Sequence, residues 1–141
     1  MSRFRWPARV YWEDTDGGGV VYYANYLRFL ERSRTEWLRS LGYSQQELAR
    51  EPGMLFVVVS ITVDYRRPAR LDDELIITCE PRADGMVAIR FTQEVLRGAD
   101  EEALAAAQVR VACVDAQTMR PRKLPEPLLN ALKSPGVART S

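Results

Sequence analysis

Two aspartates and three consecutive glycines form the part of the sequence best suited to chemistry. Asp14 and Asp16 are separated by one residue, and Gly17, Gly18 and Gly19 follow directly. A carboxylate can attack a carbonyl carbon or activate water, and glycines let backbone amides approach a ligand because no Cβ intervenes. The pattern therefore favours acyl-transfer chemistry that depends on a carboxylate.

The composition narrows this chemistry because the chain has no histidine. Ser-His-Asp and Cys-His nucleophile systems are excluded, as is every zinc site that needs an imidazole ligand. The two cysteines, Cys79 and Cys113, have no CxxC or comparable spacing. We expect them to be buried reduced thiols, neither a disulfide nor a metal site.

The aspartate and glycine stretch also has simpler interpretations. An aspartate before a helix is often a cap, and a glycine-rich segment is often only a turn. A calcium loop is another alternative, since Asp14, Asp16 and Gly19 match positions 1, 3 and 6 of its pattern. It fails at positions 5 and 12, which are Gly18 and Asn25 and supply no bidentate glutamate. A P-loop is excluded because no Lys-Ser/Thr pair follows the glycines.

The stretch lies between a predicted strand and a predicted long helix. From Arg5 to Glu13 apolar residues alternate, which indicates a strand whose buried face holds Ala8, Val10 and Trp12. From Ala24 to Leu41 they recur every three or four residues, which indicates an amphipathic helix. Its predicted buried stripe is Tyr26, Phe29, Leu30, Ser33, Trp37 and Leu41.

The ends of this helix also carry signals. Asn25 is expected to cap its start, Arg32 and Glu36 to form an i,i+4 pair, and Gly42 to end it. The first turn of a helix has unpaired N–H groups and the positive end of the macrodipole. Such a turn can stabilise the oxyanion that forms when a carbonyl is attacked.

The rest of the chain is predicted to be mostly strands. Ser44–Glu47 reads as a capping box for a short helix, and four strands are expected at 55–65, 74–82, 87–96 and 103–115, with hairpins between the last three. A short helix is expected at 126–133 and a frayed tail at 134–141. The predicted fold class is α+β, with one long helix on a largely antiparallel five-stranded sheet and residues 1–141 as a single domain.

Charge and hydropathy limit the partners. The net charge is +1 with both signs mixed along the chain, so nucleic acid is not an expected partner. No apolar run approaches the length of a membrane span and no export signal is present at the N-terminus, so the cytoplasm is the expected location. The second sheet face and the edge strands need cover, which favours a homo-oligomer joined edge to edge.

The segment Glu13–Arg34 resembles the signature of the hotdog-fold acyl-CoA thioesterases of the 4-hydroxybenzoyl-CoA thioesterase family. It most resembles the branch associated with the Tol-Pal cell-envelope system. A second segment, Val63–Leu75, is similar to the family segment that leads from the second strand into the third, and the resemblance spans residues 5–125. It implies hydrolysis of an acyl-CoA to the free acid and coenzyme A without a cofactor, by a homodimer that assembles into a homotetramer and has its active site at a subunit interface.

The resemblance also implies catalytic roles for two residues. The second acid of the family's Asp-x-Asp pair, here Asp16, acts as nucleophile or general base on the thioester. The backbone N–H that polarises the thioester carbonyl falls on Tyr23. The Tol-Pal-associated branch usually has histidine at this position whereas other members have tyrosine, but an amide donor does not depend on its side chain.

Further residues are candidates for substrate contact, although each also fits an ordinary core or surface role. They are Gly19 as a substrate-binding residue of the loop, Tyr22 and Tyr26 for the acyl group, and Arg66, Arg67 and Arg70 for the phosphates of coenzyme A. Asp14 is expected to hydrogen-bond the turn and hold Asp16. Glu31 is an alternative carboxylate, with a solvated or salt-bridged glutamate as the simpler account.

Two other functions compete with a thioesterase. One is a non-catalytic module that binds acyl-CoA or an acyl carrier protein during envelope assembly. An Asp16→Asn change separates them, because an enzyme would lose turnover whereas a binding protein would change little. The other is a hotdog dehydratase, which is disfavoured because the dehydratase pattern relies on histidine.

Overall fold

The structure is a computed structural model that describes residues 3–50 and 53–133. Its strands are β1 (Phe4–Arg9), β2 (Met54–Tyr65), β3 (Glu74–Asp84), β4 (Ala88–Arg97) and β5 (Ala103–Asp115). Its helices are α1 (Tyr26–Ser40), α2 (Gln45–Arg50) and α3 (Glu126–Lys133), with 3₁₀ turns at Trp12–Asp14 and Tyr23–Asn25. The predicted order of elements is confirmed, and the predicted tail at 134–141 lies outside the described residues.

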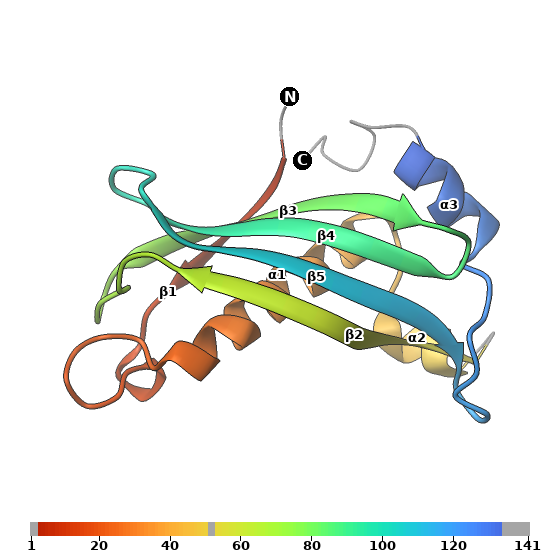
Figure 1. Ribbon diagram of the computed structural model, residues 1–141, viewed down its shortest axis with the longest axis horizontal. Helices are drawn as coiled ribbons and strands as arrows, with labels where there is room; N and C mark the ends of the chain where they lie inside the picture. Colours follow the sequence, from red (N-terminus) through yellow and green to blue (C-terminus); the bar gives the residue numbers. More distant parts are fainter. Residues whose placement is uncertain (1–2, 51–52, 134–141) are drawn as a thin grey trace.

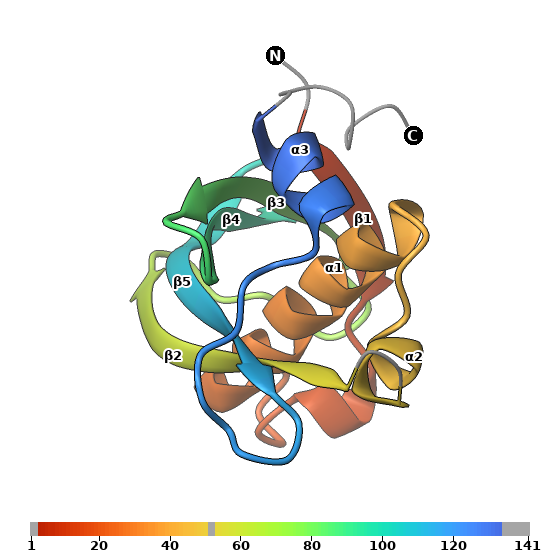
Figure 2. The same cartoon turned by 90° about the vertical axis from the view of Figure 1, so that its right-hand side faces the viewer.

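The five strands form one sheet in the order β1-β3-β4-β5-β2, and every neighbouring pair is antiparallel. Strands β1 and β2 are therefore the two edges. Figures 1 and 2 show that the sheet curves around α1, which lies along its inner face. The predicted α+β arrangement of one long helix on a five-stranded antiparallel sheet is confirmed.

Helix α1 packs through the predicted stripe. Tyr26, Phe29, Leu30, Ser33 and Trp37 are buried, and Leu41 packs half-buried against the same core. The one polar member is satisfied, since the Ser33 hydroxyl donates to the carbonyl oxygen of Ile77 across 3.0 Å. The helix ends as predicted at Gly42, whose φ of +92° favours glycine.

The sheet alternates as its sequence indicates. In β4, Ile89, Phe91, Gln93 and Val95 are buried, whereas Arg90 is exposed on the other face. Both cysteines are free and buried, so their predicted place in the core is confirmed. Leu128 and Leu129 of α3 join the same core. One continuous core therefore fixes α1 against the strands.

Three local predictions were wrong. The first strand was predicted to continue to Glu13, but β1 ends at Arg9. Trp12, predicted to be buried, is 71% exposed in a 3₁₀ turn. The turn is closed by the Asp14 carboxylate, which accepts a hydrogen bond from the Tyr11 N–H (2.8 Å). Asn25 makes no side-chain cap, since its amide donates to the Asp14 carbonyl oxygen instead. Glu36 pairs with Arg39 (2.6 Å), one turn along the helix, and not with Arg32.

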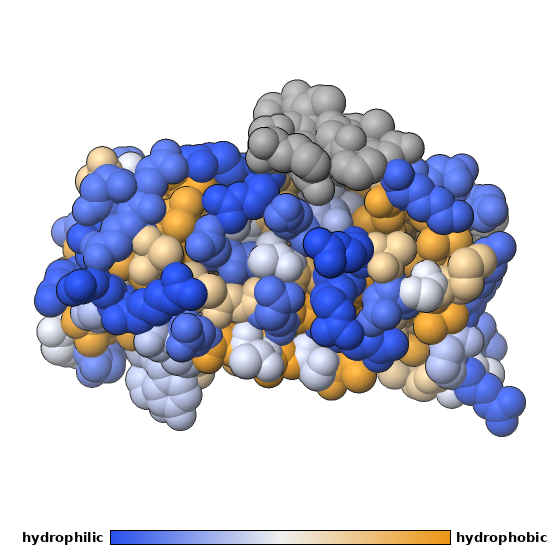
Figure 3. All heavy atoms as spheres, turned by 45° about the horizontal axis from the view of Figure 1, so that its top comes forward, coloured by the Kyte–Doolittle hydropathy of each residue, from blue (hydrophilic) through white to orange (hydrophobic). Residues whose placement is uncertain are grey.

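The exterior is mixed in polarity. In the view of Figure 3, hydrophilic side chains divide the apolar ones into small areas. Within the described ranges, no helix is long and apolar enough to cross a membrane.

Candidate active site

The aspartate and glycine segment forms a closed loop at the start of α1 (Figure 1). The Asp14 carbonyl oxygen accepts hydrogen bonds from the Tyr22 N–H (3.1 Å) and from the Asn25 side-chain amide (2.9 Å). Inside this closure, the Asp16 N–H donates to the carbonyl oxygen of Val20 (3.0 Å). These hydrogen bonds bring the two ends of the loop together, directly before the 3₁₀ turn that begins at Tyr23.

The glycines give this loop its shape and orient the Asp16 carboxylate. Gly17 and Gly19 both have φ of +89°, a conformation that other residues rarely adopt. The Gly18 N–H donates to Asp16 Oδ1 across 2.7 Å, and a Cβ on Gly18 would lie 3.1 Å from the same oxygen. Asp16 is exposed, so its carboxylate is held by one amide while it stays accessible to a substrate.

The loop is anchored to the segment between β2 and β3. The Val21 N–H donates to the Ala69 carbonyl oxygen (2.8 Å), and the Leu71 N–H donates to the Gly19 carbonyl oxygen (2.9 Å). Ala69 is fully buried and its own N–H donates to the hydroxyl of Tyr26 (2.9 Å). The two sequence segments that carry the family resemblance are therefore hydrogen-bonded to each other.

Tyr23 is the first residue of the 3₁₀ turn that leads into α1. No hydrogen bond from its N–H is found to any residue that the structure describes. An amide at the first position of a helical turn has no acceptor within the turn and lies at the positive end of the dipole. The Tyr23 amide can thus donate to an oxygen of a ligand.

The rings of Tyr22, Tyr23, Tyr26 and Tyr65 cluster at the start of α1. Tyr65, at the end of β2, donates its hydroxyl to the Tyr23 carbonyl oxygen (3.0 Å), and its ring meets those of Tyr23 and Tyr26 edge-on, with centroids 6.2 and 5.2 Å apart. Burial raises the pKa of Tyr26 and of Tyr65, so both hydroxyls stay protonated at neutral pH. Tyr22 is exposed and can meet a substrate, whereas Tyr26 is buried and its hydroxyl is engaged by the backbone.

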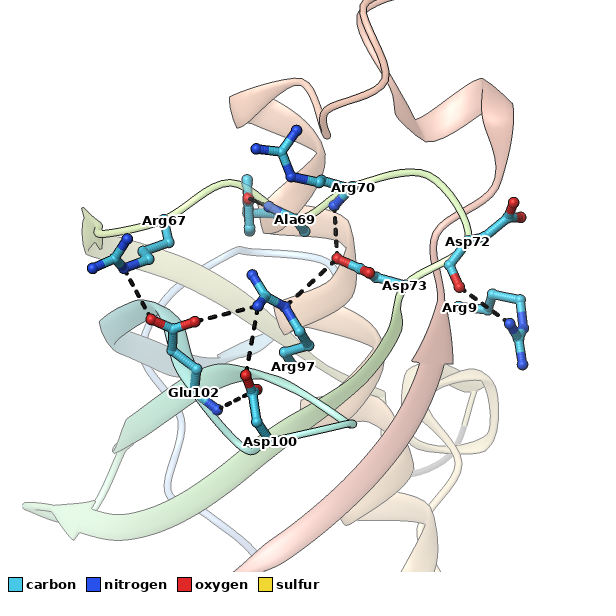
Figure 4. Close-up of polar contacts among 10 residues, drawn as sticks. Arg9, Arg67, Ala69, Arg70, Asp72, Asp73, Arg97, Asp100 and Glu102 are labelled. Atoms are coloured by element: carbon cyan, nitrogen blue, oxygen red, sulfur yellow. Dashed lines mark hydrogen bonds and ion pairs between the residues drawn. The ribbon is translucent and has the colours of Figure 1, made fainter.

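The three arginines of the predicted cluster have different partners. Arg66 faces Asp64 (3.4 Å) and Arg67 faces Glu102 (2.9 Å), and all four side chains are substantially exposed. The Arg70 guanidinium points away from Glu102 and Asp73 in Figure 4, although the Arg70 backbone N–H donates to the Asp73 carboxylate (2.9 Å). Exposed ion pairs contribute little, so Arg66 and Arg67 remain available to other anions.

Arg97, which sequence reasoning did not single out, joins this segment to the hairpin between β4 and β5 (Figure 4). Its guanidinium lies 3.3 Å from Glu102, 3.6 Å from Asp100 and 3.9 Å from Asp73. Asp73 holds the Arg70 amide, and Arg70 pairs with Val20 across an isolated β-bridge. The glycine loop is therefore connected to the β4–β5 hairpin through Arg70, Asp73 and Arg97.

Two other predicted acids have structural contacts. The Asp14 carboxylate binds the Tyr11 amide, which agrees with a role in holding the turn. Glu31 is exposed and its Oε2 accepts a hydrogen bond from the Thr35 hydroxyl (3.1 Å), one turn along α1. Neither contact gives these carboxylates an obvious part in the chemistry of the loop.

Comparison with known proteins identifies relatives of the whole chain. The profile of the family described as the thioesterase-like superfamily matches residues 10–132. The acyl-CoA thioester hydrolase YbgC of Escherichia coli O6:H1 is 48% identical over 130 residues, which cover 92% of this chain and 96% of that protein. The acyl-CoA thioesterase YbgC of Haemophilus influenzae is 46% identical over 123 residues, with 87% and 89% covered.

A solved structure shows the same architecture. The crystal structure of Slr0204, a 1,4-dihydroxy-2-naphthoyl-CoA thioesterase from Synechocystis, superposes with a TM-score of 0.86 at 25% identity. The match covers 92% of this chain and 95% of that one. The overall fold is therefore shared with a thioesterase.

Proposed function

The chain belongs to the thioesterase-like superfamily, and we propose that it hydrolyses acyl-coenzyme A to the free acid and coenzyme A. The hotdog fold and the thioesterase class predicted from the sequence are confirmed by these relatives. The observation that carries the catalytic proposal is the closed loop, which combines the exposed Asp16 carboxylate with the Tyr23 N–H, for which the described part of the chain supplies no acceptor.

The proposed chemistry uses both groups on one thioester. The Tyr23 N–H donates to the carbonyl oxygen and stabilises the negative charge that develops there. The Asp16 carboxylate either attacks the carbonyl carbon or removes a proton from the water that attacks it. The carbon–sulfur bond then breaks, coenzyme A leaves as the thiolate and takes up a proton, and the acyl group is released as the acid. In the nucleophilic route, water hydrolyses the resulting anhydride.

Coenzyme A would lie over the segment between β2 and β3. Arg66, Arg67 and Arg70 supply positive charge beside the loop, and phosphate is a natural partner for guanidinium groups. Arg70 is the best placed of the three because its guanidinium is directed away from the acids drawn in Figure 4. Gly19 and Tyr22 would contact the thioester end of the substrate.

A homodimer joined through β2 would complete the site. β2 is an edge strand, and Val58, Val59 and Ile61 on it are large apolar residues with substantial exposure. Exposed apolar edges favour pairing with another strand, and pairing across a twofold axis satisfies both copies. Pairs of dimers would form the homotetramer that the family resemblance implies.

The decisive experiment is thiol release from short, medium, long and aromatic acyl-CoAs by the unmodified chain and by Asp16→Asn. We expect the change to lower kcat by about 10²- to 10⁴-fold, because it keeps the size of the side chain but removes the base or nucleophile. Asp72→Asn is the matched control, since Asp72 is an exposed carboxylate in the segment beside the loop. Acyl-CoA binding without turnover in the unmodified chain would instead support the non-catalytic binding module.

A further inference from the structure

Asn25 lies next to both groups that the proposed hydrolysis uses. It is the last residue of the 3₁₀ turn that begins at Tyr23, and it directly precedes α1. An asparagine at this position usually caps the helix by accepting a backbone N–H through its side-chain oxygen. Asn25 makes no such cap, and its φ of −73° and ψ of −18° are already helical. Its side chain is engaged elsewhere instead.

The side-chain amide of Asn25 reaches back to the segment that carries Asp16. Its Nδ2 donates to the Asp14 carbonyl oxygen (2.9 Å), a contact between residues 11 positions apart. A carbonyl oxygen can only accept, so the nitrogen of the amide and not its oxygen faces Asp14. The Tyr22 N–H donates to the same oxygen (3.1 Å), so both lone pairs of that oxygen are used. Asn25 therefore helps to fix the backbone just before the Asp16 carboxylate.

The backbone of Asn25 orients the other reacting group. Its N–H donates to the Tyr22 carbonyl oxygen across 2.8 Å. That carbonyl and the Tyr23 N–H belong to the same peptide unit, which is planar and trans, so the two groups point in opposite directions. Because the carbonyl is held inside the 3₁₀ turn, the Tyr23 N–H is directed out of the turn, where a ligand can reach it.

The loop that joins these contacts is short and internally bonded. The Asp16 N–H donates to the Val20 carbonyl oxygen (3.0 Å), and an isolated β-bridge pairs the two sides of the loop. The bonded loop moves as a unit, so a shift of the Asp14 carbonyl is passed on to the Asp16 carboxylate. A small displacement of a reacting group can slow a reaction by a large factor. The angle between the loop and the 3₁₀ turn therefore matters for the chemistry, and Asn25 contacts both.

We propose that Asn25 is a positioning residue that sets the geometry of the Asp16 carboxylate relative to the Tyr23 N–H. It acts through the Asp14 carbonyl on one side and the Tyr22 carbonyl on the other. This role rests on the proposed hydrolysis, which is the reaction whose rate the geometry controls. The side-chain contact can be tested by substitution, whereas the backbone contact stays in place because every residue except proline has an N–H.

Asn25→Ala removes the side-chain donor to Asp14. We expect kcat on the best acyl-CoA to fall about tenfold while KM stays within about twofold, because the carboxylate shifts but substrate contacts remain. The melting temperature should fall by no more than about 4 °C, as expected for the loss of one neutral hydrogen bond. Asn130→Ala is the matched control, since Asn130 is exposed in α3 at the opposite end of the molecule (Figure 1), and it should leave kcat unchanged.

Hydrogen exchange separates a local change of angle from a general loosening. In Asn25→Ala the Tyr22 and Asp16 amides, which close the loop, should exchange at least about threefold faster. The Val21 and Leu71 amides, which anchor the loop to the segment between β2 and β3, should exchange at unchanged rates. Equal acceleration at all of these amides would make Asn25 a general stabiliser of the loop and overturn the proposal.

Asn25→Asp is the second variant and is used if Asn25→Ala does not fold. It keeps the shape of the side chain but replaces the donor by a carboxylate oxygen, which repels the Asp14 carbonyl oxygen at neutral pH. We expect kcat to fall at least as far as in the alanine variant. Unchanged kcat in either variant overturns the proposal. A rise in KM at constant kcat also overturns it, because Asn25 would then be a substrate contact.

Turnover by the unmodified chain keeps the two proposals apart. Thiol release that Asp16→Asn lowers and Asn25→Ala does not would sink the positioning role and leave the proposed hydrolysis intact. No thiol release from any acyl-CoA by the unmodified chain would sink the hydrolysis and the positioning role together.

Discussion

The hydroxyl of Tyr65 donates a hydrogen bond to the carbonyl oxygen of Tyr23 across 3.0 Å. The same carbonyl also accepts the Tyr26 N–H within the first turn, so its orientation is fixed from two directions. The Tyr23 N–H, one peptide earlier, is the proposed donor to the thioester. A strand residue therefore helps to set the direction of an amide at the start of the helix.

Tyr65→Phe removes this hydroxyl and leaves the aromatic ring. We expect kcat to fall about two- to fivefold with KM nearly unchanged, since an ordinary hydrogen bond contributes about 0.5–1 kcal/mol and acts here on the transition state. Steady-state kinetics on the best acyl-CoA measures the split. Tyr43→Phe, beyond the other end of α1, is the control, and a pure rise in KM would contradict the positioning role.

Gly18→Ala tests the geometry of the Asp16 carboxylate. Gly18 does not need a positive φ, but its new Cβ would lie 3.1 Å from Asp16 Oδ1, so the carboxylate must move by a few tenths of an ångström. We expect kcat to fall about tenfold with little loss of stability, because small misplacements of a reacting group are costly.

Gly85→Ala is the control for Gly18→Ala, because it should change stability without changing the position of a reacting group. Gly85 has φ of +72° in the turn between β3 and β4, and nothing lies within 4 Å of its added Cβ. We expect this change to lower the free energy of unfolding by about 1 kcal/mol through backbone strain while kcat stays the same. Equal losses of kcat in the two variants would refute the Asp16 argument.

The spacing of apolar residues predicts most of the fold. The alternation of Ile89, Phe91 and Val95 and the helical spacing from Tyr26 to Trp37 predict which faces are buried, and the structure agrees. These signals are strong because each strand and α1 has one face in the core. The turn residues then locate the hairpins.

The polar contacts that end β1 and support the loop could not be predicted. Trp12 fits an alternating strand, but a local carboxylate to amide bond at Asp14 and Tyr11 turns the chain instead. Tyr65 and Arg97 gain their roles only from strand pairing and from the hairpin, which set their neighbours. The hydrophobic pattern specifies burial, whereas the polar partners of Tyr65 and Arg97 depend on how the strands pair in the folded protein.

Arg97→Gln should loosen the support of the glycine loop. The change removes a guanidinium whose Nε is buried and leaves three nearby carboxylates without it. We therefore expect a loss of about 1–2 kcal/mol in the free energy of unfolding. Hydrogen exchange should accelerate at the Val21 and Leu71 amides more than within α1. Arg90→Gln, on the same strand but paired with Asp84, is the control and should leave those two amides unchanged.

The loss of stability at acid pH should depend in part on Asp84. Hydrogen bonds from Arg110 (2.7 Å) and Arg90 (3.2 Å) hold the pKa of the Asp84 carboxyl below its ordinary value of 3.8, with the Arg110 bond as the largest cause. A carboxyl whose pKa is lowered on folding stabilises the protein above its unfolded pKa, and this contribution is lost as the pH falls through the folded pKa. The free energy of unfolding, measured with urea between neutral pH and pH ~3, should therefore fall less steeply toward low pH for Asp84→Asn than for the unmodified chain. Parallel declines would mean that the two arginines do not favour the ionised form in the folded state.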